Sequence, residues 1–118
     1  MKSYTDITQS KKLAEILPIE SADMKFPYFG DGQYGSSAVF GEPIEFSGGK
    51  DVPCWSLAAL LSVFSVPKLE KDEGEDGEVE WWVVSHYTDD YRYESDYRDE
   101  PIDACYNLIL KIKEKDLL

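Results

Sequence analysis

Apolar residues recur at helical spacing in three stretches of the chain, residues 6–17, 51–64 and 101–115. The first stretch ends at Pro18, a residue type that disfavours helical geometry in the residue before it. The third begins at Pro101, and the acids at its start and the lysines near its end suit the dipole of a helix. Its buried stripe is expected to comprise Ile102, Cys105, Leu108, Ile109 and Ile112. The pattern therefore predicts one helix near each end of the chain and one in the middle.

The middle stretch, DVPCWSLAALLSVF, is apolar around most of its circumference, which indicates a central, buried helix. Asp51 is a natural N-cap residue for it, and Pro53 fits the first turn, where a missing N–H costs little. Cys54 is then expected within the first turn of this helix.

Two further parts of the chain favour strands. Residues 24–46 contain aromatic and β-favouring segments on either side of GDGQ, whose glycines suit a tight hairpin turn. VEWWVVSHY, residues 79–87, is the strongest strand pattern, and a turn at residues 88–90 is expected to return the chain as YRYESDY, residues 91–97. The resulting order α-β-β-α-β-β-α predicts a single α+β domain over residues 1–118, in which an antiparallel sheet of about four strands packs against three helices.

An acidic segment separates the middle helix from the second pair of strands. Seven acids lie between Glu70 and Glu80, around Gly74 and Gly77. Dense like charge and scarce apolar side chains do not support packing into a core. We therefore expect a mobile acidic loop at about residues 68–78, with the extended tip of a hairpin as the alternative.

The 118 residues carry a formal net charge of −12, which limits the possible partners. Phosphate backbones and anionic membranes repel such a chain, so direct binding to nucleic acid or to a membrane is not expected. An alternative is a DNA mimic, in which the acids of residues 70–80 and 89–100 imitate phosphates and occupy a basic site of a nucleic-acid enzyme. No apolar run approaches the roughly 20 residues of a membrane-spanning helix, and the start lacks a secretory signal pattern. A cytoplasmic protein is therefore expected.

Cys54 and His86 are the residues that would perform nucleophilic catalysis if the chain were an enzyme. A cysteine at a helix start has a lowered pKa, and a histidine on a downstream strand follows the order of papain-like hydrolases. The glutamine and the glycine-serine lead-in of the papain motif are missing. Packing is therefore the favoured role of Cys54, and a small cysteine-dependent hydrolase using Cys54 and His86 is the alternative. Cys54 and Cys105 are expected to be reduced thiols, and neither a metal site nor a cofactor is predicted.

The tyrosines of the last predicted hairpin occupy odd positions: Tyr87, Tyr91, Tyr93 and Tyr97. Four charged residues occupy even ones: Asp90, Arg92, Glu94 and Asp96. If both arms stay extended, one face of the hairpin is tyrosine and the other is charged. A turn that breaks the alternation leaves Tyr87 inward and the later three on the more exposed arm. Tyrosine is enriched in interfaces because it combines a rigid apolar ring with a polar tip. We predict a partner-binding surface at Tyr91, Tyr93 and Tyr97, with ordinary sheet packing as the alternative.

Three stretches together, TDITQSKKLAEILPIESADM, DVPCWSLAALLSVF and PIDACYNLILKIKEKDLL, resemble a group of small proteins encoded on phages and prophages of gut Bacteroidales. The resemblance covers about half of the chain and leaves out its acidic middle. It implies no activity and no site residues, but it implies a mobile genetic element, where small acidic proteins often bind a host or phage protein. The expected function is therefore that of a non-enzymatic phage or prophage accessory protein acting through protein–protein contacts.

Overall fold

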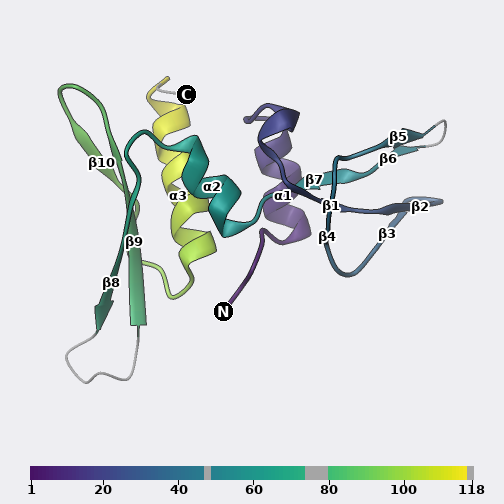
Figure 1. The fold of residues 1–118 in the computed structure, drawn as a ribbon, viewed down its shortest axis with the longest axis horizontal. Coiled ribbons are helices and arrows are strands. Elements are labelled where there is room, and N and C mark those ends of the chain that lie inside the picture. Colours follow the sequence, from purple (N-terminus) through teal and green to yellow (C-terminus); the bar gives the residue numbers. More distant parts are fainter. Residues whose placement is uncertain (47–48, 74–79, 117–118) are drawn as a thin grey trace. The chain divides into compact units, whose positions relative to one another are not determined.

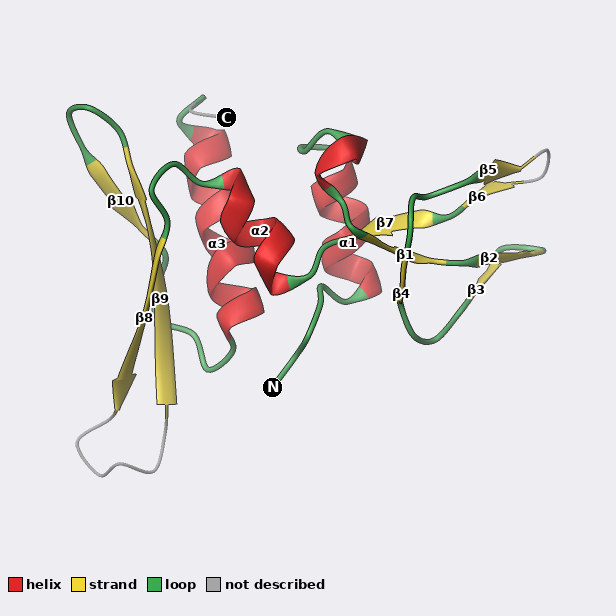
Figure 2. Cartoon of the chain, in the orientation of Figure 1, coloured by secondary structure: helices red, strands yellow, loops and turns green. Residues whose placement is uncertain are grey.

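The computed structural model describes residues 1–46, 49–73 and 80–116. Helices and antiparallel strands both contribute to the fold, which confirms the α+β class and the three expected helices (Figure 2). The chain divides into two compact units. We call residues 4–59 the N-terminal unit and residues 1–3 with 60–118 the C-terminal unit, and describe each by itself.

The N-terminal unit combines one α-helix with several short strands. Its elements are α1 (Ile7–Ala14), the 3-10 helix η1 (Ile19–Ser21), β1 (Met24–Phe26), β2 (Tyr28–Gly30), β3 (Gln33–Tyr34), β4 (Val39–Phe40), β5 (Glu45–Phe46), β6 (Gly49–Lys50) and β7 (Val52–Cys54). Strands β4, β1 and β7 form an antiparallel sheet in that order, and β2–β3 and β5–β6 are separate pairs. Its apolar cluster comprises Met24, Phe26, Val52 and Cys54, with Tyr4, Ile7, Tyr34 and Ala38 packed against it.

Helix α1 begins where the sequence predicts and ends earlier. The Asp6 carboxylate accepts a hydrogen bond from the Gln9 N–H at 2.8 Å, and the Gln9 side chain accepts one from the Asp6 N–H at 3.1 Å. This reciprocal capping box fixes the start. The helix ends at Ala14, three residues before the predicted end at Leu17.

The hairpin predicted around GDGQ is present as the pair β2–β3. Gly30, Asp31 and Gly32 have positive φ angles of 97°, 52° and 75°. Glycine adopts this conformation readily and aspartate tolerates it, so the local sequence dictates the turn.

The prediction that the middle helix begins at Asp51, with Cys54 in its first turn, is wrong. Residues 52–54 form strand β7, which pairs with β1 so that Cys54 lies opposite Met24, and α2 covers only Leu57–Val63. Val52 precedes a proline and is therefore biased toward extended backbone. The helix is capped instead by Ser56, whose hydroxyl oxygen accepts a hydrogen bond from the Ala59 N–H at 3.2 Å.

The C-terminal unit is a three-stranded sheet with a long helix on it (Figure 1). Strands β8 (Lys68–Glu73), β9 (Glu80–Tyr87) and β10 (Arg92–Glu94) are antiparallel in the order β10-β9-β8, and α3 (Pro101–Glu114) packs against β9. The buried apolar residues are Leu60, Phe64, Val83, Val84, Ile102, Ala104, Cys105, Leu108, Ile109 and Ile112. The predicted stripe of the last helix is thereby confirmed.

The acidic segment is in part a strand. Residues 68–73, which the sequence assigned to a loop, form β8, and Leu69 lies opposite the fully buried Val84. Pairing with β9 satisfies the backbone N–H and C=O groups on one side of β8. The charged side chains of β8 are of the kind that protects an exposed sheet edge from further pairing. Residues 74–78 of the expected loop lie outside the described residues. Among the described residues the strands form four small sheets, where one sheet of about four strands was expected.

Candidate interaction surface

The two faces of the C-terminal sheet are defined by the alternation along β9. Val84 and His86 point to the face that packs against α3, which we call the inner face. Trp81, Val83, Ser85 and Tyr87 point to the opposite, outer face. In the C-terminal unit, α3 lies on one side of the sheet, and no other described helix of that unit covers the outer side (Figure 1).

The turn between β9 and β10 separates the tyrosines. The Thr88 N–H donates to the Tyr91 carbonyl at 2.8 Å, and the Tyr91 N–H donates to the Thr88 hydroxyl at 3.1 Å. Because four residues form this loop, Arg92 lies opposite Tyr87, and Tyr93 lies opposite His86. Tyr87 therefore faces outward with Arg92, whereas Tyr93 is on the inner face. The expected single tyrosine face is not formed, and the alternative with Tyr87 inward is also wrong.

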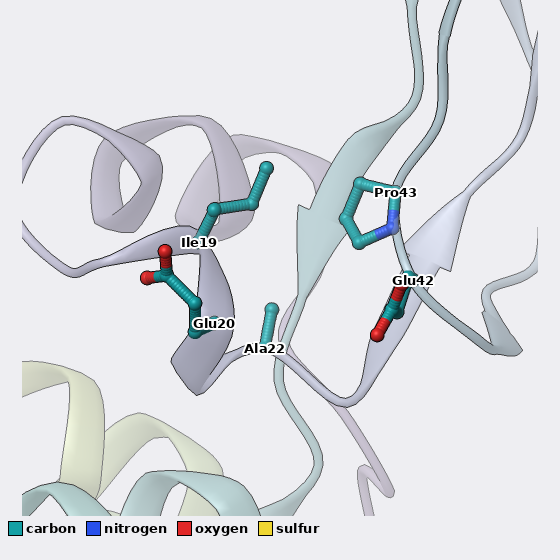
Figure 3. A pocket seen from close by; sticks show the side chains of 5 residues that line it. All are labelled: Ile19, Glu20, Ala22, Glu42 and Pro43. Carbon is teal, nitrogen blue, oxygen red and sulfur yellow. The ribbon is translucent and has the colours of Figure 1, made fainter.

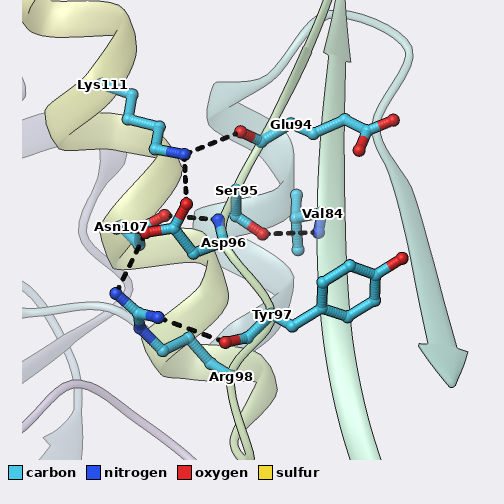
Figure 4. Close-up of polar contacts among 8 residues, drawn as sticks. All are labelled: Val84, Glu94, Ser95, Asp96, Tyr97, Arg98, Asn107 and Lys111. Atoms are coloured by element: carbon cyan, nitrogen blue, oxygen red, sulfur yellow. Dashed lines mark hydrogen bonds and ion pairs between the residues drawn. The ribbon is translucent and has the colours of Figure 1, made fainter.

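A bulge then sets the direction of Tyr97. Glu94 lies opposite Ser85 and Arg98 lies opposite Trp82, so three residues, 95–97, face only two, 83–84. Such a bulge redirects the side chains that follow it. The Val84 N–H donates to the Ser95 hydroxyl at 2.9 Å, which keeps the bulge closed. Tyr97 projects across β9, away from the side on which Asp96 and Arg98 lie (Figure 4).

Asp96 attaches the bulge to α3. Its carboxylate lies 2.6 Å from the Lys111 Nζ, and its N–H donates to the Asn107 side-chain oxygen at 2.7 Å (Figure 4). The hydrogen bond and the positive charge of Lys111 lower the pKa of the Asp96 carboxyl, and Arg98 contributes to the same effect. Because Asp96 is held toward α3, the next side chain, Tyr97, is directed to the outer face.

The three predicted site residues therefore do not form one surface. Tyr91 is 67% exposed in the turn, and its ring centroid lies 6.1 Å from that of Tyr93. Tyr93 is half-buried, with its ring centroid 6.4 Å from the His86 ring. Tyr97 is 50% exposed on the outer face. Tyr91 and Tyr93 are neighbours, and Tyr97 belongs to a different group of side chains.

The outer face contains two residues that sequence reasoning missed, Trp81 and Arg92. Trp81 is 39% exposed. The Arg92 guanidinium lies 5.7 Å from the centre of the Tyr87 ring, donates to the Ser85 hydroxyl at 3.1 Å and pairs with Glu70 at 3.1 Å and Glu94 at 3.0 Å. The signal for Trp81 was available, because adjacent tryptophans in a strand must point to opposite faces.

Cys54 has the environment of a packing residue. It is fully buried, on a strand instead of a helix start, and its thiol donates to the Thr5 carbonyl at 3.3 Å. Burial raises the pKa of the Cys54 thiol, although hydrogen bonds with Thr5 and Ser10 oppose the rise. A nucleophilic cysteine needs the opposite shift.

His86 and Cys105 are also enclosed. The His86 Nδ1 accepts a hydrogen bond from the Ser65 N–H at 2.9 Å, and burial lowers the pKa of this imidazole. His86 and its donor Ser65 belong to the C-terminal unit, whereas Cys54 and its acceptor Thr5 belong to the N-terminal unit. Burial raises the pKa of the Cys105 thiol to about 12, and both cysteines are free.

We expect Cys54 to react slowly with thiol reagents in the native protein. In a Cys105→Ala variant, where Cys54 is the single thiol, modification by a chromogenic disulfide at pH 8 should be roughly tenfold or more slower than after denaturation, because the thiol is buried and its pKa is raised. The measurement is the absorbance time course with and without denaturant. Equal rates in the two conditions would contradict the packing role.

Comparisons with known proteins give no family for this chain: no protein-family model, curated protein or solved structure matches it. In the part of the chain that the structure describes, no helix is long and apolar enough to cross a membrane. Within the same residues, no three histidine, cysteine or acidic side chains gather closely enough to hold a metal ion.

Proposed function

We propose that this protein is a non-enzymatic phage or prophage accessory protein, and that it binds a host or phage protein through the outer face of the C-terminal sheet. The observation that carries the proposal is the grouping of Trp81, Tyr87, Arg92 and Tyr97 on one sheet face that no other described helix of the unit covers. Tryptophan, tyrosine and arginine are the residue types that dominate the energetics of protein interfaces.

The arrangement of these side chains supports the proposal further. Arg92 is held by contacts with Tyr87, Ser85, Glu70 and Glu94, and the Asp96–Lys111 pair directs Tyr97 outward. Side chains ordered before association lose less conformational entropy when a partner binds. The individual ion pairs are exposed and contribute little to stability, so their main effect is to order the surface.

The nature of the partner follows from charge and context. The net charge of −12 disfavours direct contact with nucleic acid, so the proposed partner is a protein. The phage or prophage setting rests on the sequence resemblance. The enclosed environments of Cys54 and His86 support a non-enzymatic role, because neither group is poised for acid–base or nucleophilic chemistry.

The test is comparative affinity purification from the native bacterial host. Tagged wild-type protein should capture a specific protein, and the Trp81→Ala/Tyr97→Ala variant should capture roughly tenfold less of it, because both aromatic contacts are lost. Bound proteins are identified and quantified by mass spectrometry.

The matched control is Tyr91→Ala, which removes an exposed tyrosine outside the outer face. It should retain the partner, and both variants should keep a native circular dichroism spectrum. Loss of the partner with Tyr91→Ala but not with the outer-face variant would move the site to the Tyr91–Tyr93 pair. Absence of any specific protein in the wild-type sample would refute the proposed function.

A further inference from the structure

A groove with an apolar floor lies within the N-terminal unit, between η1 and the segment that follows β4. Its first part has a volume of about 260 Å³ and is lined by Ile19, Glu20, Ala22, Glu42 and Pro43. Ile19 and Pro43 face each other across this hollow (Figure 3). Ile19 is 52% exposed, so the groove offers a large apolar side chain to a ligand.

The groove continues into a second hollow of about 190 Å³. Ile19 and Pro43 line both hollows, and the second adds Ile44, which is 49% exposed, and Glu45. The shared residues make the two hollows one continuous surface. Two adjoining hollows with apolar side chains between them suit an extended peptide segment better than a compact small molecule.

The charge along the groove is uneven. In the described part of the chain, neither Glu20 nor Glu42 forms an ion pair. In the lining of the second hollow, Lys50 balances the charge of Glu45, and the Asp51 carboxylate is paired with Lys25 at 3.4 Å. The excess negative charge is therefore concentrated beside the first hollow, at Glu20 and Glu42.

Each side of the groove is held by a hydrogen bond to a buried side chain. On the η1 side, the Nε1–H of the fully buried Trp55 donates to the Ser21 hydroxyl at 2.9 Å. On the opposite side, the Asp51 carboxylate accepts a hydrogen bond from the Ile44 N–H at 2.9 Å. A groove fixed in this way is formed before a ligand arrives, which lowers the entropy cost of binding.

We infer that this groove binds a basic peptide segment of a partner protein, with an apolar side chain between Ile19 and Pro43 and lysine or arginine beside Glu20 and Glu42. The apolar floor supplies buried area, and the two carboxylates supply the charge complementarity that selects a basic sequence. The net charge of −12 accelerates the encounter with such a segment. This site lies in the other unit from the outer face and does not depend on the proposed function.

The experiment is a selection of random seven-residue peptides displayed on yeast, with the whole chain as bait. The enriched peptides should share an apolar residue flanked by lysine or arginine. One enriched peptide is then synthesised with a fluorescent label, and its Kd is measured by anisotropy. The affinity should fall when the salt concentration is raised, because exposed charges are screened.

Two double variants separate the groove from the overall charge. Glu20→Lys/Glu42→Lys should weaken binding of the labelled peptide roughly tenfold or more, because attraction becomes repulsion. Asp89→Lys/Asp90→Lys changes the net charge equally at an exposed turn of the C-terminal unit and should change the Kd less than about twofold. Ile19→Ser should also weaken binding, since it removes an apolar side chain that lines both hollows without changing the charge.

The melting temperatures of all variants are measured alongside, and each altered side chain is exposed in the wild-type structure. Equal losses with the two double variants would show attraction by net charge alone and would overturn the inference. The same conclusion follows if no basic peptide is enriched, or if Ile19→Ser binds as the wild type does. None of these variants alters Trp81 or Tyr97, so failure here is distinguishable from failure of the outer-face proposal.

Discussion

Replacing Asp51 with alanine is expected to lower the free energy of unfolding by about 3 to 5 kcal/mol, the usual cost of removing one member of a buried ionic network. The Asp51 carboxylate is almost fully buried and accepts hydrogen bonds from the Tyr28 N–H at 2.8 Å and the Ile44 N–H at 2.9 Å. It also lies 3.4 Å from the Lys25 Nζ. Alanine leaves these donors without their acceptor. Glu45→Ala, at a nearby exposed acid, should change stability by less than about 0.5 kcal/mol.

The Asp51 contribution should depend on pH in a defined direction. Burial raises the pKa of this carboxyl, but the hydrogen bonds from Tyr28 and Ile44 and the charge of Lys25 outweigh it, so the pKa in the folded protein lies below the ordinary 3.8. The unfolded chain therefore binds the proton more readily. The stabilisation is complete above the unfolded pKa and is lost as the pH falls through the folded pKa. Urea titrations of the wild type and Asp51→Asn should show a constant difference near neutral pH that shrinks below about pH 4. A difference that does not change with pH would contradict this account.

Replacing Trp55 with alanine is expected to cost about 3 to 5 kcal/mol, as is usual for truncating a large buried aromatic residue. The indole is fully buried and donates to the Ser21 hydroxyl at 2.9 Å, and the Trp55 N–H donates to the Thr5 hydroxyl at 3.2 Å. The truncation leaves a cavity and removes the indole N–H that donates to the Ser21 hydroxyl. Thermal and urea denaturation, followed by circular dichroism, measure the loss.

Two tryptophan variants provide the controls. Trp55→Phe keeps most of the apolar volume and loses the indole hydrogen bond, so it should cost about 1 to 2 kcal/mol. Trp81→Ala, on the outer face, should cost less than about 1 kcal/mol because Trp81 is partly exposed. Similar losses for Trp55→Ala and Trp81→Ala would contradict the difference in burial between the two side chains.

The elements that could be predicted from the sequence are those with local signals. Helix α3 has a long apolar stripe and a proline at its start, and the turn at Gly30–Gly32 has the residues that its positive φ angles favour. In these elements the local preference and the final fold agree, so periodicity and turn composition are sufficient.

The start of α2 could not be predicted because two local patterns were compatible with the same residues. Asp51 followed by Val52 and Pro53 suits a helix cap, but it equally suits an extended strand. The decision depends on β1, which pairs with residues 52–54, and on the donors of Tyr28 and Ile44. Strand β1 and Tyr28 are distant from this segment in the sequence, so the local pattern around residues 51–54 gives no information about them.

The outer face was not predicted because its residues depend on how the two strands pair. Assigning odd and even positions to opposite faces assumes a regular hairpin, in which neither the turn nor a bulge shifts the pairing. The four-residue turn and the bulge at residues 95–97 each change the count by one. Tyr97 was predicted as a partner-binding residue, whereas its neighbours on the outer face, Arg92 and Trp81, follow only from the observed register.

The central position of Asp51 also determines when the N-terminal unit can close during synthesis. The Tyr28 and Ile44 N–H groups precede their acceptor, the Asp51 carboxylate, by 23 and 7 positions. The Thr5 hydroxyl accepts a hydrogen bond from the Trp55 N–H, which lies 50 positions later. The ribosome releases the chain from its N-terminus, so the Tyr28 and Ile44 N–H groups emerge before their acceptor and are first hydrogen-bonded to water. We therefore expect the N-terminal unit to stay open during translation until β7 and Trp55 have left the exit tunnel, and the nascent chain to be accessible to chaperones and proteases in that interval.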